Sequence, residues 1–245
     1  MKVAAYQAPL LPPGSSGGIG LVRRQVERCE AEGVSILCCP EAILGGLADD
    51  NERPQDIALS VDAGALASML APLASDGVTT IVGFTEAADE GRLYNAAAVF
   101  HRGAVLGVYR KLHPAINRSV YDAGRDVPVF QVDALRFGIV ICNDSNFPEP
   151  ARQIAAQGAA VLFVPTNNGL PPSRGGTELV ARARDVDRAC AVENRLWVIR
   201  ADVAGRAGAL ESHGASGVVD PSGRVIRTAR ALEEDFLVVE IDVTR

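Results

Sequence analysis

Short runs of apolar residues recur along this sequence, and several of them are apolar on both faces of the strand they would form. Examples are Ser35–Cys39, Leu135–Ile141 and Val161–Val164. Strands of this kind are usually covered by layers of structure on both sides of their sheet. Segments with apolar residues at helical spacing lie between them, such as Ile19–Glu32 and the stretch that Thr177 is expected to cap. The alternation predicts a layered α/β domain.

The remaining apolar runs extend this pattern to both ends of the chain. The helix after Thr177 is expected to bury one stripe, made of Leu179, Ala183, Val186 and Cys190. Further strands are predicted at Lys2–Gln7, Thr79–Phe84, Leu93–Phe100, Ala104–Tyr109, Pro128–Val132, Leu196–Ala201, Ala215–Val219, Val225–Thr228 and Phe236–Ile241. The 245 residues contain no linker and no repeat, so we expect a single domain over residues 1–245.

Charge and cysteine content narrow the classes of function. The net charge is −6 and Lys and Arg form no dense block, which argues against nucleic acid and anionic membranes as partners. No run reaches the roughly 20 apolar residues that a membrane span needs, and no signal peptide is recognisable. The five cysteines form no C-x-x-C pair and the three histidines are scattered. We therefore expect a cytoplasmic protein without a metal site.

A cysteine stands where one apolar run ends, in the segment GIVICNDSNFPEPAR. Free cysteines are among the most buried residue types, so a core position is one interpretation of Cys142. The other is a nucleophile, because open α/β sheets place their sites at the carboxyl ends of strands. A sharp turn from strand to helix also exposes a nucleophile and offers backbone N–H groups to an oxyanion. The polar run Asn143–Asn146 would be costly to bury, which favours a cleft.

A cysteine nucleophile needs a base that removes its proton or a cation that stabilises the thiolate. His113 and His213 are candidates for the base, but nothing in their local sequence marks either one. Glu41 and Lys111 each follow an apolar run, and each alone is better explained as a solvent-exposed residue. An acid, an amine and a thiol at three strand ends are chemically complementary, although spacing by itself does not prove that they converge.

Five parts of the sequence, in order over essentially the whole chain, resemble the nitrilase, or carbon–nitrogen hydrolase, superfamily. They are CCPEAILGG, GRLYNAAAVFHRGAVLGVYRKLHP, GIVICNDSNFPEPAR, ARARDVDRACAVENRLWVIRADVAG, and the closing strands HGASGVVDPSGRVI and FLVVEIDV. The resemblance implies a four-layer α-β-β-α sandwich with a Glu-Lys-Cys triad. By position, Glu41 is the general base, Lys111 the cation that stabilises the transition state and Cys142 the nucleophile.

The resemblance also implies an activity. A small linear amide would be hydrolysed through a thioester on Cys142, with release of ammonia or an amine and without a metal or organic cofactor. Family members often pair their sandwiches, so a homo-oligomer, dimer or higher, is implied as well. True nitrilases usually follow the cysteine with Trp-Glu. The pair Asn143–Asp144 in this chain favours an amide or carbamoyl substrate over a nitrile.

Three asparagines are candidate substrate-binding residues. The backbone N–H of Asn143 is a plausible second donor to the oxyanion. Many family members carry a second glutamate between the lysine and the cysteine, whereas this chain has none there and offers Asn117 near that place. Asn167 ends a strand, and contact with the substrate or a hydrogen bond within the loop explains it equally well.

Two alternatives remain open at the level of sequence. An N-carbamoyl compound hydrolase would use the same triad and differ in its leaving group and products. A non-catalytic ligand-binding member of the family would keep the scaffold, and the absent second glutamate is the reason to consider it. Arg174 and Arg182 suit the binding of a substrate carboxylate, although each is better explained as solvent-exposed.

Overall fold

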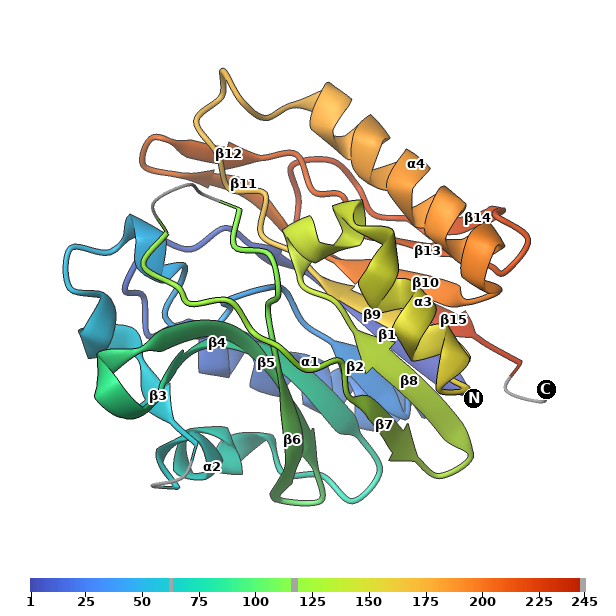
Figure 1. The fold of residues 1–245 in the computed structure, drawn as a ribbon, viewed down its shortest axis with the longest axis horizontal. Coiled ribbons are helices and arrows are strands. Elements are labelled where there is room, and N and C mark those ends of the chain that lie inside the picture. The colour runs from blue at the N-terminus through green and yellow to red at the C-terminus, as the bar shows by residue number, and fades with distance from the viewer. Residues whose placement is uncertain (62–63, 116–118, 243–245) are drawn as a thin grey trace.

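Two β-sheets pack face to face, and helices cover the outer face of each (Figure 1). The computed structural model describes residues 1–61, 64–115 and 119–242. The layers run α-β-β-α. This arrangement confirms the predicted four-layer sandwich.

The first sheet is mixed and has nine strands in the part of the chain that the structure describes. Its main order is β12-β11-β1-β2-β4-β5-β6, while β15 pairs with β1 and β3 pairs with β4. The parallel neighbours β1, β2 and β4 form its centre. The strands are β1 (Lys2–Pro9), β2 (Ile36–Cys38), β3 (Leu59–Ser60), β4 (Thr79–Ala87), β5 (Leu93–His101), β6 (Ala104–Arg110), β11 (Val203–Ala207), β12 (Leu210–Ser212) and β15 (Asp235–Glu240).

The second sheet has the order β14-β13-β10-β9-β8-β7. Its central strands β8, β9 and β10 are parallel, and hairpins close both edges. The strands are β7 (Val129–Val132), β8 (Leu135–Ile139), β9 (Val161–Pro165), β10 (Trp197–Ala201), β13 (Gly217–Val219) and β14 (Val225–Thr228). The carboxyl ends of β8, β9 and β10 therefore lie at one edge of the sandwich, where sites of such sheets form.

The longer helices lie outside the sheets, and short 3₁₀ turns join several elements. The cluster of α1 and α2 packs on the first sheet, and the cluster of α3 and α4 packs on the second. The helices are α1 (Gly18–Glu32), α2 (Ala65–Leu70), α3 (Pro148–Ala156) and α4 (Thr177–Asn194), and the short turns are η1 (Ala48–Asp50), η2 (Pro54–Ile57), η3 (Ala71–Leu73), η4 (Asp89–Gly91) and η5 (Cys142–Asn146). None of the helices in the described residues is both long and apolar enough to cross a membrane.

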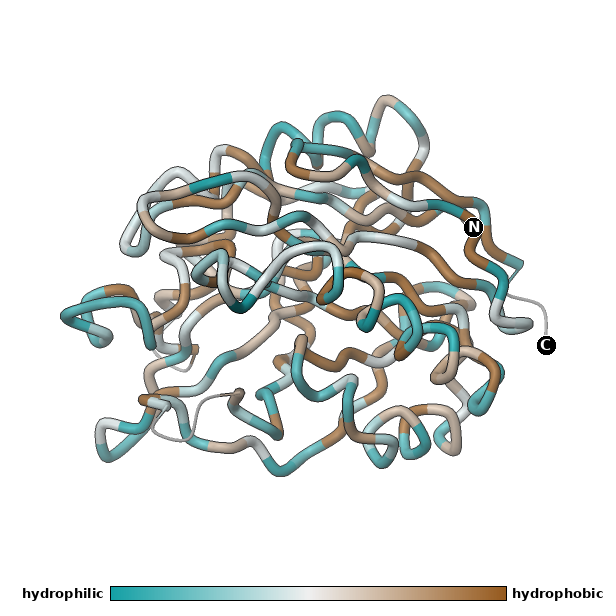
Figure 2. The backbone as a smooth tube through the Cα atoms, turned by 90° about the horizontal axis from the view of Figure 1, so that it is seen from above, coloured by the Kyte–Doolittle hydropathy of each residue, from teal (hydrophilic) through white to brown (hydrophobic). Residues whose placement is uncertain are grey.

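The main core fills the space between the sheets. Ile36 and Ile81 of the first sheet belong to the same buried cluster as Phe137, Phe163 and Ile199 of the second. Figure 2 shows hydrophobic stretches running through the middle of the molecule, with hydrophilic loops around them. Because both faces of the central strands are buried, their sequences are apolar on both faces.

Helix α4 departs from two sequence predictions. Thr177 is the first helical residue and Gly176 is the N-cap, with a φ of 96° and no side-chain cap, so the predicted threonine cap is wrong. The predicted stripe is only half-buried, whereas Asp187 and Ala191 are the buried residues of this helix. The reason is that α4 supplies a carboxylate to a buried cation of the second sheet, as described below.

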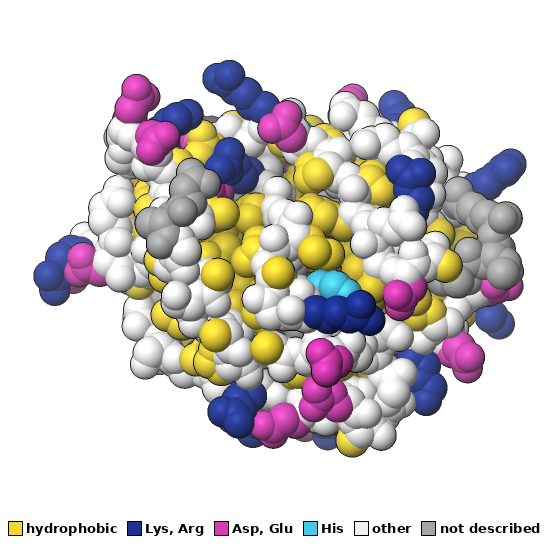
Figure 3. Space-filling view, turned by 90° about the horizontal axis from the view of Figure 1, so that it is seen from below, with side chains coloured by type: hydrophobic (Ala, Val, Ile, Leu, Met, Phe, Trp, Pro, Cys, Tyr) yellow, Lys and Arg dark blue, Asp and Glu magenta, His cyan; other side chains and the backbone are white. Residues whose placement is uncertain are grey.

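Apolar side chains also reach the surface. Figure 3 shows such side chains among charged ones on the face that contains α2 and the β5–β6 hairpin. Met69 on α2 and Leu106 on β6 are exposed, the latter at 48%. Single exposed apolar residues are normal on protein surfaces, so this face indicates no binding site by itself. The homo-oligomer stays a prediction.

Candidate active site

Glu41 lies in the turn that follows β2, and its carboxylate is fixed on both oxygens. Oε1 accepts hydrogen bonds from Lys111 Nζ at 2.6 Å and from Asn95 Nδ2 at 2.7 Å. Oε2 accepts one from the backbone N–H of Asn167 at 2.9 Å. The residue is only 1% exposed. A buried carboxylate with three donors has a single orientation available to it, as a positioned acid or base requires.

Lys111 follows the last residue of β6 and is almost fully buried. Its backbone N–H donates to the carbonyl oxygen of Asn95 at 2.8 Å, so the strand pairing with β5 places it opposite Glu41. Burial lowers the pKa of Lys111, but the negative charge of Glu41 and the hydrogen bond to it raise the pKa, which lies above its usual value. The ammonium group therefore stays charged across the neutral pH range.

Cys142 is the first residue of the turn η5, and its backbone has a φ of 45°. A positive φ is uncommon for a residue other than glycine and marks a strained, sharp turn. The side chain is partly exposed, and Sγ lies 4.0 Å from Asn168 Oδ1. Burial and the charge of Glu41 raise the pKa of Cys142 to about 12, although Lys111 and Arg200 lower it. The resting group is thus a thiol, and attack by its sulfur requires a base.

Asp144 connects the cysteine turn to the segment that carries Lys111. Its Oδ2 accepts hydrogen bonds from the Tyr109 hydroxyl at 2.8 Å and from the Ile141 N–H at 3.1 Å. Its Oδ1 accepts one from the His113 N–H at 2.7 Å. These bonds fix the position of the turn relative to the end of β6, so the thiol and the ammonium group have a defined relation to each other.

A buried ion pair lies beneath the same turn. Arg200 of β10 and Asp187 of α4 are both fully buried, and their charged atoms approach to 2.5 Å. Arg200 also donates to Thr166 Oγ1 at 2.8 Å and to Ser145 Oγ at 3.1 Å. The Ser145 hydroxyl in turn donates to the carbonyl oxygen of Cys142 at 2.7 Å. The pair therefore supports the backbone of the cysteine turn.

Glu41, Lys111 and Cys142 all line one cavity of about 310 Å³. The structure therefore brings together the three residues that the sequence suggested as a set. Asn143 and Asn167 line the cavity as well.

The asparagine side chains have local partners. Asn143 Nδ2 donates to the carbonyl oxygen of His113 at 3.1 Å. Asn167 Oδ1 accepts from the Gly169 N–H at 3.0 Å, which is the loop hydrogen bond considered for it. The third candidate, Asn117, lies outside the described residues.

Neither histidine considered as a base belongs to this cavity. The ring of His113 stacks on Phe147 with centroids 3.8 Å apart, and His213 Nε2 lies 3.2 Å from Glu211 Oε1. Both are absent from the lining of the cavity. In residues 1–61, 64–115 and 119–242 no group of three or more His, Cys, Asp or Glu side chains is arranged to hold a metal ion.

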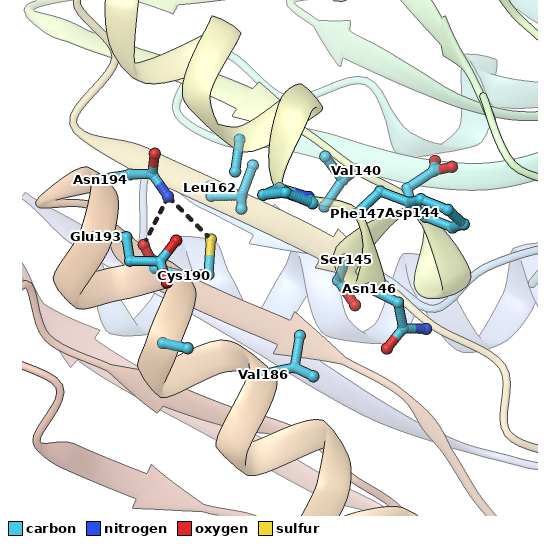
Figure 4. Close-up of a pocket in the computed structure, with 13 residues that line it drawn as sticks. Val140, Asp144, Ser145, Asn146, Phe147, Leu162, Val186, Cys190, Glu193 and Asn194 are labelled. Atoms are coloured by element: carbon cyan, nitrogen blue, oxygen red, sulfur yellow. Dashed lines mark hydrogen bonds between the residues drawn. The ribbon is translucent and has the colours of Figure 1, made fainter.

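A second cavity, of about 190 Å³, shares Ser145 and Asn146 of the cysteine turn with the first (Figure 4). Ser145 and Phe147 of the turn region face Val186 and Cys190 of α4 across it. Asn194 Nδ2 lies 3.8 Å from the sulfur of Cys190. Cys190 is partly exposed and is therefore a thiol against which the reactivity of Cys142 can be compared.

Several residues of the site were not recognised from the sequence. Asn95 binds Glu41, and Asp202 accepts hydrogen bonds from the backbone and side chain of Asn168 at 3.0 and 2.8 Å. Arg200 carried a usable signal, because a charged residue inside the apolar run LWVIRA must find a buried partner. Asp187 carried none, since an aspartate on a helix is normally exposed.

Known proteins resemble this chain in sequence and in structure. A hydrolase from Pseudomonas protegens, named for the 5' region of pqqF, is 32% identical over 99% of this chain and 83% of its own length. A nitrilase from Pyrococcus abyssi is 29% identical over 89% of this chain and 80% of its own. The structure also resembles an amidase from Nesterenkonia sp. AN1, with a TM-score of 0.80, 25% identity, and coverage of 99% of this chain and 93% of that one.

In that amidase, a glutamine-for-glutamate variant, acrylamide has added to the active-site cysteine. The family model for carbon–nitrogen hydrolases matches residues 2–245, which is nearly the whole chain. A match of this extent, together with the relatives above, shows that the chain belongs to the carbon–nitrogen hydrolase family, the nitrilase superfamily.

Proposed function

We propose that this protein hydrolyses a small linear amide through a thioester on Cys142. The observation that carries the proposal is the fixed Glu41–Lys111 pair, 2.6 Å apart, in the same cavity as a partly exposed thiol. A base, a permanent cation and a nucleophile are the groups that acyl transfer from an amide requires. The mechanism needs no metal ion and no organic cofactor.

Acylation begins with the thiol in its protonated form. Glu41 accepts the proton as the sulfur of Cys142 attacks the carbonyl carbon of the amide, and a tetrahedral oxyanion forms. Lys111 stabilises the negative oxygen, and the backbone N–H of Asn143 is the second donor that we assign to it. Glu41 then gives its proton to the amide nitrogen, the carbon–nitrogen bond breaks, and ammonia or an amine leaves. The acyl group remains as a thioester on Cys142.

Deacylation repeats these steps with water. Glu41 removes a proton from the water molecule that attacks the thioester carbonyl, and Lys111 again stabilises the oxyanion. The carbon–sulfur bond breaks, the proton returns to the sulfur, and the carboxylic acid leaves. The net reaction consumes one amide and one water and yields a carboxylic acid and ammonia or an amine. Glu41 is suited to both half-reactions because its three hydrogen bonds hold it in place throughout.

The direct test is the release of ammonia from a panel of simple amides, dicarboxylate monoamides, carbamoyl amino acids and nitriles, with carbon dioxide measured in parallel. Cys142→Ala should lose all turnover while its circular dichroism and unfolding temperature stay those of the wild type. Cys190→Ala is the matched control, because it removes a thiol that lines the neighbouring cavity, and it should keep full activity.

The outcomes separate the candidate functions. Ammonia without carbon dioxide, lost in Cys142→Ala, supports the amidase. Carbon dioxide released with ammonia identifies an N-carbamoyl compound hydrolase with the same residues. Undiminished turnover in Cys142→Ala would refute the thiol mechanism. Binding of a panel compound without any turnover would favour a ligand-binding member of the family.

A further inference from the structure

Two exposed arginine residues line the cavity that contains Cys142. Arg174 comes from the loop between β9 and α4, and Arg182 comes from the second turn of α4. Leu179, Arg182 and Ala183 all line the cavity, and their spacing of three and four residues places them on one face of the helix. That face of α4 therefore forms a wall of the cavity, with Arg182 as its charged member.

The loop that carries Arg174 is anchored to β12 and contains a turn. The backbone of Leu170 pairs with that of Glu211 through hydrogen bonds of 3.1 and 2.9 Å. The backbone N–H of Arg174 itself donates to the carbonyl oxygen of Pro171 at 2.8 Å. The Arg174 side chain therefore starts from a defined turn next to the cavity.

The other charged groups of the cavity already have partners. Glu41 is paired with Lys111, and Arg200 is paired with Asp187. Asp49, the remaining acid of the lining, accepts hydrogen bonds from the hydroxyl of Ser119 and the N–H of Val120.

The two arginines differ from these groups. No carboxylate in the described parts of the chain lies within ion-pair distance of Arg174 or Arg182, although Glu178 and Asp185 are near Arg182 on α4. Guanidinium groups bind carboxylates through paired, charge-assisted hydrogen bonds. The lining of the cavity therefore offers two cations to an anionic group.

The volume of the cavity also limits the size of the substrate that can bind in it. A volume of about 310 Å³ is at the small end of ligand pockets, which suits a compound of a few carbon atoms. Leu47, Leu170 and Leu179 line the cavity and provide apolar surface for a short methylene chain. A short molecule that fills this cavity would carry an amide group at the end near Cys142 and a negative group at the end near the arginines.

We propose that Arg174 and Arg182 form an anion subsite, and that the substrate is the monoamide of a small dicarboxylic acid. This inference rests on the proposed amidase function for the position of the amide group. Succinamate and glutaramate are the probes. Butyramide and pentanamide, which carry a methyl group in place of the carboxylate, are their uncharged counterparts.

The experiment measures binding and turnover separately. Calorimetry with Cys142→Ala gives the dissociation constant of each probe without hydrolysis, and kcat/KM is measured with the active enzyme. We expect at least one charged amide to bind tighter than its uncharged counterpart, and more weakly as salt is raised. Arg174→Gln and Arg182→Gln should each weaken the charged amide about tenfold to hundredfold and leave the uncharged amide unchanged. Arg152→Gln on α3, exposed and outside the cavity, is the matched control.

The results distinguish this inference from the proposed function. Charged amides that bind no tighter than uncharged ones, or arginine variants that weaken both kinds equally, would overturn the anion subsite while hydrolysis of uncharged amides still supported the amidase. Arginine-dependent binding of the charged probes without turnover of any amide would support the subsite and refute the amidase.

Discussion

Replacing Gly83 by alanine is expected to displace the turn that carries Glu41. Gly83 lies in the middle of β4, directly behind this turn. A Cβ atom on Gly83 would lie 2.4 Å from the backbone nitrogen of Ala42 and 2.5 Å from the carbonyl oxygen of Pro40. These are backbone atoms, so no side-chain rotation relieves the overlap. The turn itself must move.

The size of the movement follows from the geometry. Ordinary van der Waals contact begins at 3.4 Å, so the closest approach of 2.4 Å requires a retreat of about 1 Å. The retreat would strain the hydrogen bonds that Glu41 accepts from Lys111, Asn95 and Asn167. A misplacement of about 1 Å can reduce the rate of an enzyme roughly 100-fold, and overpacking typically costs about 1–3 kcal/mol of stability.

The assay combines kcat/KM on the best amide of the panel with thermal unfolding. Gly83→Ala should reduce kcat/KM about 100-fold and lower the unfolding temperature by about 2–12 °C for a chain of this length. Gly77→Ala is the control, because a Cβ atom there meets nothing within 4 Å. If Gly83→Ala keeps wild-type activity and stability, the close approach of β4 does not position Glu41.

Two further predictions follow from the electrostatics of the site. Because the charge of Glu41 raises the pKa of Cys142, Glu41→Gln should lower that pKa, so the ultraviolet absorbance of the Cys142 thiolate should appear at a lower pH in the variant while amide hydrolysis is lost. A thiolate that appears at the same pH as in the wild type, or at a higher one, would contradict this. Asp187→Asn leaves the Arg200 cation unpaired in the core and should cost about 3–5 kcal/mol in urea unfolding. Glu27→Gln, which breaks an exposed helical pair, should cost less than about 0.5 kcal/mol, and equal losses in the two variants would refute the reasoning.

Most of the layered fold could be predicted because its central strands are apolar on both faces. The strands β11 and β12 could not be predicted, because their sequence VAGRAGALES is rich in glycine and polar residues. Their pairing depends on β1 and on the hydrogen bond that the Ser212 hydroxyl donates to the Val203 carbonyl oxygen at 2.7 Å. The buried stripe of α4 was misplaced for a related reason. Hydropathy favours Leu179 and Val186 as core residues. Asp187 is buried in their place because the buried Arg200 needs a counter-ion.

In the candidate site, the three proposed catalytic residues could be predicted from the sequence, but the residues that hold them in place could not. Glu41 and Cys142 stand directly after an apolar run, and Lys111 stands one residue beyond another, so the local sequence places all three near the ends of strands. Their supports are not local. Asn95 lies 54 residues from Glu41, and Tyr109 lies 35 residues from Asp144, so only the pairing of the sheets brings these partners together.

The central claim is that hydrolysis passes through a thioester on Cys142, and partition of that intermediate tests it most directly. A primary amide and an N-methylamide with the same acyl group are hydrolysed at one fixed concentration of hydroxylamine, and the ratio of hydroxamate to carboxylic acid is measured for each. A common thioester predicts the same ratio from both substrates, because the leaving group has departed before hydroxylamine or water attacks. Different ratios, or no hydroxamate at all, would contradict the covalent mechanism.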